Sequence, residues 1–589
     1  MILQALKEYY DRKYEDPESG MPPFGWEWQG IPYLIVLDTD GNAVALQSTY
    51  EQEGKDRKAK SFLLPKREER TSGVLANLLW DKTEYVIGIE VKGKNDPVFS
   101  DSSRKKSEAF LQKMENLGEV DDPGWNATLK FLSKAPKEKV EALSRFATWK
   151  ELLADKKCLI TFKLDGSFGT VAESEKVKQA INGRRKGSAA EERCRCLITN
   201  EVEPVARIHP SIKGVLGGHP SGTTIVGFNQ NSFCSYGKEK GSNAPVGEKA
   251  AFAYTTALNY LLRHDSPNRF LIGGTTVVVW GQKPNNLETN LKIFIEEPKD
   301  NPDRGTELIR NLFASVKSGA WTKSEEKDRF YILGLSPNNA RLAIRFWENS
   351  TVKEVSERLA EYFEDIKIIH GPKNEEYLSI SRILLSLASR GKSDNIPPNI
   401  EGDLMRAVFE GLPFSKALLK NAIRRNRVEQ NVSYPRAGLI KACLNREFRF
   451  YLKSEEELKV ELDGNNKNIG YRLGRLFAAL EKIQTDANSG LNSTICDRYY
   501  GAASGTPVTV FPSLMRLVRH HFNKLSPGTR IYDQKLLEEI FSGISDFPRF
   551  LTLAEQGSFA IGYYHQREAF RTGKNKQDTS SAESAEDSL

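Results

Sequence analysis

The segment 207–262 is rich in glycines and in amide side chains, so it offers hydrogen-bonding groups with little charge. Its first half is rich in glycine, and its second half is rich in Asn and Ser before an apolar helical pattern begins. Glycine lets a backbone approach a ligand closely, and amides recognise hydrogen-bonding edges. Apolar residues along the segment argue against disorder, so it is either a ligand-contacting loop or a packed loop that bridges two halves of a domain. The candidate contact residues are Lys213, Gly217, Gly218, Ser221, Asn229, Asn231, Tyr236 and Asn243.

A second candidate site is the segment 63–80, LLPKREERTSGVLANLLW. Basic side chains that neutralise phosphate stand beside small hydroxyl and amide groups, a combination suited to the groove of a duplex. The alternative is a solvated turn before a helix, which the residues alone favour. The tip VKGKND at 91–96 has the same chemistry. The candidates in these two segments are Lys66, Arg67, Arg70, Thr71, Ser72, Asn77, Lys92, Lys94 and Asn95.

Arginines in the carboxy-terminal region repeat at helical spacing. Arg472 and Arg475 are three residues apart, and Arg516 and Arg519 repeat that spacing, so each pair shares a helix face. Tyrosines lie nearby in sequence, and basic residues interleaved with aromatics suit a groove that follows a single-stranded backbone. The alternative is the ordinary solvated face of an amphipathic helix. The candidates are Arg472, Arg475, Arg498, Arg516, Arg519 and Lys524.

Residue patterns of enzymes are weak in this chain. The dipeptide His264-Asp265 lacks further His and Asp ligands at the positions that metal-dependent nucleases need. Neighbouring His520 and His521 cannot both face one metal, because successive helical side chains point about 100° apart. No Gly-Lys-Ser/Thr phosphate-binding loop occurs. We therefore expect no catalytic group, metal or cofactor, and a metal-dependent nuclease is the weakest alternative.

Composition limits the class of protein. A chain of 589 residues exceeds one ordinary core, so two to four domains are expected. The excess of 85 basic over 78 acidic residues is too small to indicate a partner by itself. No apolar run approaches the ~18 residues of a membrane span, and the first residues are amphipathic, unlike a signal peptide. The six cysteines show no repeated pair spacing, which predicts free thiols and a cytoplasmic protein.

Hydrophobic periodicity predicts an α+β fold, with mixed helices and strands to about residue 370 and helices alone beyond 375. Thr39-Asp40-Gly41-Asn42 marks a hairpin turn. The expected helices are 1–15, 105–117, 138–155, 173–181, 248–264, 304–317 and 352–366, and the expected strands are 32–38, 43–47, 84–91, 158–164, 275–280, 329–334 and 341–347.

These elements predict five regions along the chain. The acidic stretch 454–468 is expected to be a linker, and the polar end of the chain is expected to be disordered. The predicted regions are an α/β amino-terminal domain at 1–290, an α/β middle region at 291–370, a helical region at 371–453, a carboxy-terminal helical bundle at 454–572 and a tail at 573–589.

Several segments together resemble the large subunit of the type I-C CRISPR surveillance complex, Cascade. The resemblance begins with MILQALKEYYDRKY and KREERTSGVLANLLWDKTEYVIGI and continues through ARIHPSIKGV, SGTTIVGFNQNSFCSYGKEKGSNAPV and RFYILGLSPNNARLAIRFW. It ends with NIGYRLGRLFAALEKIQ, CDRYYGAASGTPVTVFPSLMRL and LAEQGSFAIGYYHQRE. The likeness spans nearly the whole chain in the order of the family.

The resemblance implies a non-catalytic subunit in RNA-guided antiviral defence. Guide RNA supplies sequence specificity, while the protein recognises the short flanking motif, the PAM, helps to open the DNA and stabilises the R-loop. The amino-terminal domain is expected to contact the PAM, and the carboxy-terminal bundle resembles the small subunit that lines the displaced strand. The implied partners are guide RNA, target duplex, displaced single strand, backbone subunits, the guide-RNA-processing subunit, small subunits and a recruited helicase–nuclease. A DNA- or RNA-binding protein that works alone is the alternative.

Overall fold

The computed structural model describes residues 1–53, 56–68, 73–92, 96–155, 158–185, 193–272, 274–296, 302–318, 326–453, 457–488 and 490–586. The chain forms two compact units. The first unit comprises Met1–Ile212 and Val226–Tyr260, and the second comprises Lys213–Ile225 and Leu261–Leu589. The fold is α+β, as predicted.

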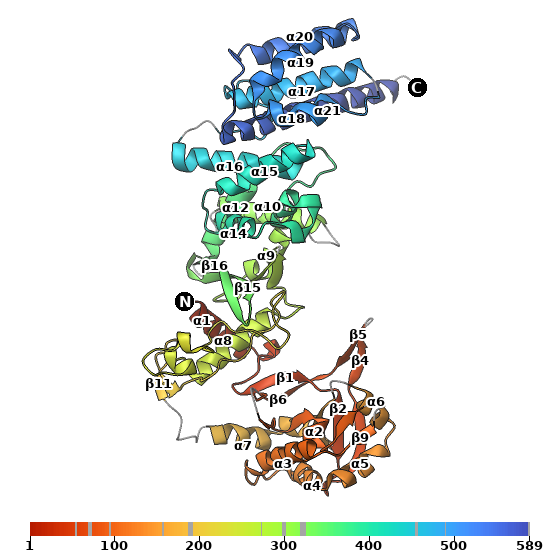
Figure 1. The fold of residues 1–589 in the computed structure, drawn as a ribbon, viewed down its shortest axis with the longest axis vertical. Coiled ribbons are helices and arrows are strands. Elements are labelled where there is room, and N and C mark those ends of the chain that lie inside the picture. Colours follow the sequence, from red (N-terminus) through yellow and green to blue (C-terminus); the bar gives the residue numbers. More distant parts are fainter. Residues whose placement is uncertain are drawn as a thin grey trace. The chain divides into compact units, whose positions relative to one another are not determined.

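A four-stranded sheet organises the first unit. Its strands follow the order β3 (Ala43–Ser48), β2 (Tyr33–Leu37), β10 (Leu159–Leu164) and β7 (Trp80–Lys82), and only β2 and β10 are parallel. The predicted hairpin of 33–48 is confirmed. Figure 1 shows α3 (Asp101–Glu115) and α4 (Pro123–Leu132) grouped with this sheet, and rings from both helices pack on Phe162 of β10.

Two smaller ladders and two packed helices also belong to this unit. β1 (Trp26–Gly30) pairs with β6 (Ser61–Pro65), and β4 (Tyr50–Glu53) pairs with β5 (Asp56–Ala59). The helix predicted at the amino terminus is α1 (Ile2–Tyr14), where Tyr9 lies 6.3 Å, ring to ring, from Tyr260 of α8 (Glu248–Leu261). Further described elements of the unit are α5 (Pro136–Ser144), α6 (Thr148–Ala154), α7 (Glu175–Arg185), β11 (Arg193–Arg195) and β12 (Val202–Pro204).

One predicted strand of this unit is wrong. The segment 84–91 begins as the helical turn α2 (Thr83–Val86), and only β8 (Glu90–Lys92) is extended. Tyr85, Val86, Ile87 and Ile89 are all buried, so the apolar run carries no alternation that distinguishes the two conformations. The predicted helix 138–155 is likewise two helices, α5 and α6.

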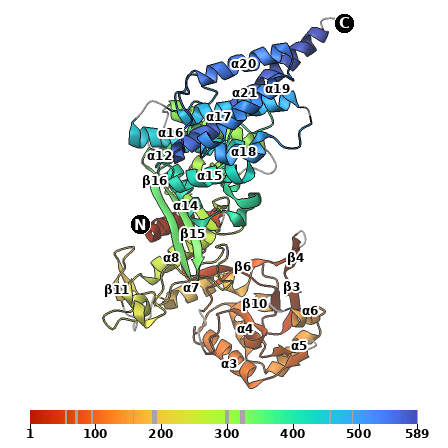
Figure 2. The same cartoon turned by 45° about the horizontal axis from the view of Figure 1, so that its top comes forward.

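The second unit contains the sheet β13 (Arg269–Ile272), β14 (Thr275–Gly281), β15 (Arg329–Asn338) and β16 (Arg341–Thr351), antiparallel in that order. Every residue of β14 is buried, which its unbroken apolar run predicted. Figure 2 shows β15 and β16 as one long hairpin. Because β14 pairs with β15, the predicted domain boundary at residue 290 falls inside this unit.

The helices that follow the sheet were predicted, whereas the helix 286–295 was not. Thr351 and Glu354 form a reciprocal capping box at the start of the first helix after the sheet. The described helices are α9 (Asn286–Ile295), α10 (Pro302–Ser318), α12 (Val352–Ile366), α13 (Ile380–Leu387), α14 (Pro398–Phe409), α15 (Lys416–Glu429), α16 (Tyr434–Glu447), α17 (Ile469–Ala487), α18 (Ile495–Ala503), α19 (Phe511–Phe522), α20 (Pro527–Phe541) and α21 (Leu553–Glu586).

Glycines bring α17 and α21 into backbone contact. A Cβ at Gly474 would overlap the carbonyl oxygen of Phe559, and one at Gly562 would overlap that of Tyr471. Both views show α17 and α21 side by side in the bundle with α19 and α20 (Figures 1 and 2). The bundle therefore depends on positions where no side chain fits.

The predicted regions 371–453 and 454–572 share one hydrophobic core, which extends from Phe270 to Tyr564. The described part of the expected linker, 457–468, packs on α16. Leu458 is 4% exposed and exchanges two hydrogen bonds with the Asn445 side chain, at 2.9 and 2.8 Å. Helix α21 runs to Glu586, past residue 573 where the predicted tail begins. No proline interrupts this stretch, so nothing in it prevents helical continuation.

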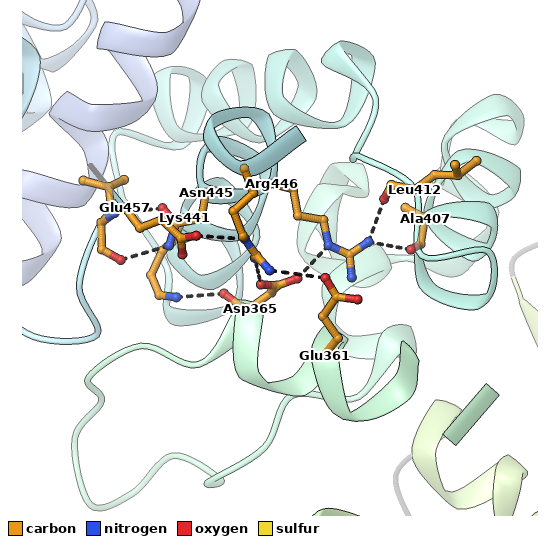
Figure 3. Close-up of polar contacts among 10 residues, drawn as sticks. Glu361, Asp365, Ala407, Leu412, Lys441, Asn445, Arg446 and Glu457 are labelled. Carbon is orange, nitrogen blue, oxygen red and sulfur yellow. Dashed lines mark hydrogen bonds and ion pairs between the residues drawn. The ribbon is translucent and has the colours of Figure 1, made fainter. Parts of the chain in front are cut away.

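A buried charge cluster ties α12 to α16. Arg446 Nε donates to Asp365 at 2.6 Å, and Arg446 Nη1 donates to the carbonyl oxygens of Ala407 and Leu412, each at 2.6 Å. Lys441 donates to the Asp365 carbonyl oxygen at 2.9 Å. Figure 3 shows these groups converging between the helices. The cluster therefore holds α12 against α16.

Candidate nucleic-acid interface

The stem of the 66–80 loop is fixed to the first unit by its charged side chains. Arg67 Nε donates to Glu27 at 2.9 Å, its Nη2 donates to Gln29, and its guanidinium lies 5.8 Å from the Trp80 ring. The Lys66 ammonium lies 5.5 Å from the Phe252 ring. Both predicted contact residues are half-buried, so they hold the base of the loop.

Asn77 anchors this loop, contrary to the expectation that it meets a ligand directly. It is 5% exposed, and its side-chain oxygen accepts from the Glu68 backbone at 3.0 Å. Its own N–H donates to buried Asp81 at 2.8 Å. Leu79 between them has φ +67°, a strained value for a leucine. The sequence could not reveal this, because an amide beside a turn is equally suited to either role.

Most other candidates of this region lie outside the described residues, namely Arg70, Thr71, Ser72, Lys94 and Asn95. Lys92 closes β8, and its backbone pairs with Asp96 of β9 (Asp96–Val98). Its side chain also lies outside the described residues.

The long loop of 207–247 is divided between the two units. Residues 213–225 belong to the second unit, where Leu216 N–H donates to Thr276 at 2.9 Å and Thr224 is bonded to both Ala340 and Leu342. Lys213, Gly217 and Ser221 are exposed along it, and Gly218 is half-buried. Residues 213–225 are therefore hydrogen-bonded to the sheet of β14, β15 and β16, which fits the alternative of a packed loop.

The other half, in the first unit, displays an aromatic ring. Asn243 accepts from the Ser235 backbone at 2.9 Å and donates to the carbonyls of Lys238 and Lys240, so its amide is used inside the loop. Tyr236 is 99% exposed with φ +54°, a region that bulky residues rarely adopt. Asn229 and Asn231 are also exposed.

The predicted pair Arg472 and Arg475 does not form an exposed surface. Arg475 is 2% exposed and donates to Gln566 and Glu539, each at 2.9 Å. Arg472 is half-buried against Gly543 and donates to the Asn466 carbonyl at 2.7 Å. Their spacing does place them on one helix face, but that face packs inside the bundle.

The remaining carboxy-terminal candidates are exposed. Arg516 and Arg519 lie on α19, Lys524 follows it, and Arg498 lies on α18. Lys524 donates to Asn488 at 2.7 Å, and Arg516 makes long bonds to its own helix. Arg498 and Arg519 form no ion pair with any residue that the structure describes. Tyr500, Tyr563 and Tyr564 are buried, so the expected aromatic interleaving is wrong at these positions.

The residues that the sequence offered as metal ligands are not grouped in the described part of the chain. His264 and Asp265 lie in an exposed turn after α8. Within the described ranges, no three His, Cys, Asp or Glu side chains are grouped so that they could hold a metal. None of the helices in these ranges combines the length and apolarity of a bilayer span.

The chain also matches a known protein family. The family described as CRISPR-associated protein (Cas_Csd1) matches residues 6–571 of the 589. No curated protein matches the chain. The match covers both units, including the loop anchored by Asn77 and the helices that carry the exposed arginines. The chain therefore belongs to the CRISPR-associated Csd1 family, the large subunits of type I-C Cascade.

Proposed function

We propose that this large subunit recognises the PAM on target duplex DNA, helps to open the duplex and holds the displaced strand. Guide RNA would supply sequence specificity by base pairing. The subunit itself would break no covalent bond and would leave cleavage to a recruited helicase–nuclease. Its other partners would be the backbone subunits, the guide-RNA-processing subunit and small subunits.

The exposed arginines of the carboxy-terminal bundle carry the displaced-strand part of this proposal. Arg498 and Arg519 have no ion-pair partner among the described residues, so their charge is available to a phosphate backbone. Arg516 lies three residues before Arg519 on the same helix, and both are exposed. Such charges follow a single strand without recognising its sequence.

The PAM part of the proposal is supported by the anchored loop of the first unit. Arg67, Asn77 and Asp81 fix both ends of 66–81 by hydrogen bonds. Fixing the two ends of a loop lowers the entropic cost of ordering it on a ligand, which favours contact with a groove.

A reconstituted complex tests the proposal. Cascade assembled with guide RNA is offered a guide-matched duplex with or without the PAM, and permanganate detects unpaired thymines in the displaced strand. We expect tighter binding and more unpaired thymines with the PAM, and intact DNA when the isolated chain is incubated with divalent metal. Equal binding of both duplexes contradicts PAM recognition. Metal-dependent cleavage that His264→Ala abolishes would support the nuclease alternative.

A further inference from the structure

A pocket on the first unit lies apart from all the candidate residues above. It has a volume of about 270 Å³ and opens between the β2–β3 edge of the main sheet, strand β6 and the turn after β10. Leu34 and Phe62 supply apolar lining, Gln47 and Ser48 supply polar groups, and Lys60 and Lys163 supply positive charge.

The turn after β10 presents an aromatic ring to solvent beside this pocket. Phe168 is fully exposed, although a phenylalanine is normally stabilised by burial. The turn is nevertheless rigidly built, because Ser167 donates its hydroxyl to the Leu164 carbonyl at 2.6 Å and Asp165 N–H donates to the Leu37 carbonyl at 2.8 Å. Hydrogen bonds of Asp165 and Ser167, which come just before Phe168, therefore hold the turn that carries the exposed ring.

The opposite wall is also fixed. Thr49 N–H donates to the Pro32 carbonyl at 2.9 Å, and Lys60 N–H donates to the Thr49 carbonyl at 3.2 Å. Tyr50 donates its hydroxyl to Asp155 at 2.6 Å, and the Arg57 guanidinium lies 4.1 Å from its ring. The pocket thus needs little reorganisation to accept a ligand.

The charge of the pocket favours an anion. Lys60 is exposed and Lys163 is half-buried, and neither forms an ion pair with any described residue. Glu51 also lines the pocket, so one carboxylate accompanies two ammonium groups. A flat apolar ring, two cations and neutral polar groups together match a nucleotide, whose base stacks and whose phosphate carries the charge.

Strand β6 connects this pocket to the anchored loop. Lys60 immediately precedes the strand and Lys66 immediately follows it, so five extended residues, about 17 Å, separate the pocket from the loop proposed to contact the PAM. We propose that the pocket binds one unpaired nucleotide, with its base on Phe168 and its phosphate near Lys60 and Lys163. The inference rests on the proposed function only in requiring that the protein binds nucleic acid.

Base-stacking fluorescence tests the pocket directly. The full-length chain is titrated with single-stranded DNA, with RNA of the same sequence and with duplex DNA, each carrying one 2-aminopurine. We expect a single strand to be quenched on binding, and the arm that binds more tightly identifies DNA or RNA as the source of the nucleotide. Phe168→Ala should remove the quenching and weaken binding about 5- to 100-fold, whereas Phe168→Tyr should retain both.

Matched variants provide the controls. Phe99→Ala removes another exposed ring from the same unit and should leave binding unchanged. Lys60→Gln and Lys163→Gln should each lower the slope of log affinity against log salt by about 0.7, and exposed Lys137→Gln should not. Circular dichroism should show equal unfolding midpoints for Phe168→Ala and wild type, because the fully exposed ring contributes no buried surface.

Two outcomes overturn the inference. One is that Phe168→Ala and Phe99→Ala have the same small effect on both single strands. The other is that duplex is bound through Phe168 as tightly as a single strand. If PAM discrimination by the assembled complex survives either outcome, only the pocket is wrong; if wild-type complex ignores the PAM, the proposed function fails separately.

Discussion

Arg446 Nε lies 2.6 Å from Asp365 Oδ2, and neither side chain is more than 5% exposed. Asp365 has one further charged partner, the partly exposed Arg449, so removing Arg446 leaves a buried carboxylate whose charge is only partly compensated. We therefore expect Arg446→Met to lower the free energy of unfolding of the second unit by about 3–5 kcal/mol, measured by urea denaturation.

Arg406 offers the matched control for this ion pair. It pairs with Asp403 within α14 and is 54% exposed, so Arg406→Met should cost at most about 0.5 kcal/mol. The double variant Asp365→Leu, Arg446→Met should be more stable than Arg446→Met alone, because the Asp365 carboxylate is no longer buried without Arg446. Equal losses for the two single arginine variants would show that burial of the Arg446 pair has no energetic weight.

Gly474→Ala tests the backbone contact between α17 and α21. The added methyl group would overlap the Phe559 carbonyl oxygen, so we expect a loss of about 1–3 kcal/mol in unfolding free energy. Gly501 on α18 has no atom within 4 Å of a built Cβ, and Gly501→Ala should be neutral or stabilising by up to about 1 kcal/mol. The interpretation fails if both substitutions stabilise the protein.

The parts of the fold that the sequence predicted are those governed by local patterns. Asp40-Gly41 gave the first hairpin, and Gly41 has φ +78° in the structure. Alternation in 329–347 gave the hairpin of β15 and β16, and amphipathic spacing gave the helices beyond it. Where an apolar run was short and buried throughout, as in 83–89, the pattern held no information and the strand prediction was wrong.

The candidate site was harder to predict because burial depends on distant residues. Arg475 is buried by Glu539 and Gln566, which are 64 and 91 residues away along the chain. Spacing alone therefore could not distinguish it from the exposed Arg516. Phe168 presents the reverse case: an aromatic after a buried strand suggests core, and only the hydrogen-bonded turn shows that it faces solvent.

Two buried histidines predict a loss of stability in mild acid. Burial lowers the pKa of His209 to about 4 and that of His565 to about 3. As the pH falls below about 6.5, the unfolded chain takes up these protons while the folded chain does not, so stability falls with pH. For His209 the loss should reach roughly 3 kcal/mol near pH 4.

The histidine prediction is checked by comparing urea midpoints of wild type and His209→Gln between pH 7 and pH 4. The variant should show a flatter pH dependence, because the difference between the two proteins isolates this group from the carboxylates that titrate in the same range. His264→Gln changes an exposed histidine and serves as the control. An unchanged profile for His209→Gln would mean that His209 already takes up its proton in the folded state.

The carboxy-terminal arginines separate into two predicted classes. In the assembled complex, Arg516→Ala and Arg519→Ala should each weaken displaced-strand binding and lower the salt slope by about 0.7, because each removes an exposed phosphate contact. Arg475→Ala should leave the slope unchanged and lower the unfolding midpoint, because Arg475 bonds only inside the bundle. A reduced slope for Arg475→Ala, or an unchanged one for Arg519→Ala, would reverse this assignment.

Asn77 and Arg70 should affect DNA binding by different routes. Asn77 accepts from the Glu68 backbone inside the protein, so Asn77→Ala should release the loop, lower the unfolding midpoint of the first unit and weaken binding to PAM-bearing duplex. Asn77→Asp retains the acceptor and should restore much of both losses.

Arg70→Ala should leave the midpoint unchanged and lower PAM-dependent binding by about 1–3 kcal/mol, the value of a good base contact. If Arg70→Ala weakens PAM-bearing and PAM-free duplexes equally, its contact is to phosphate; if Asn77→Ala alters PAM preference at an unchanged midpoint, Asn77 meets the DNA itself.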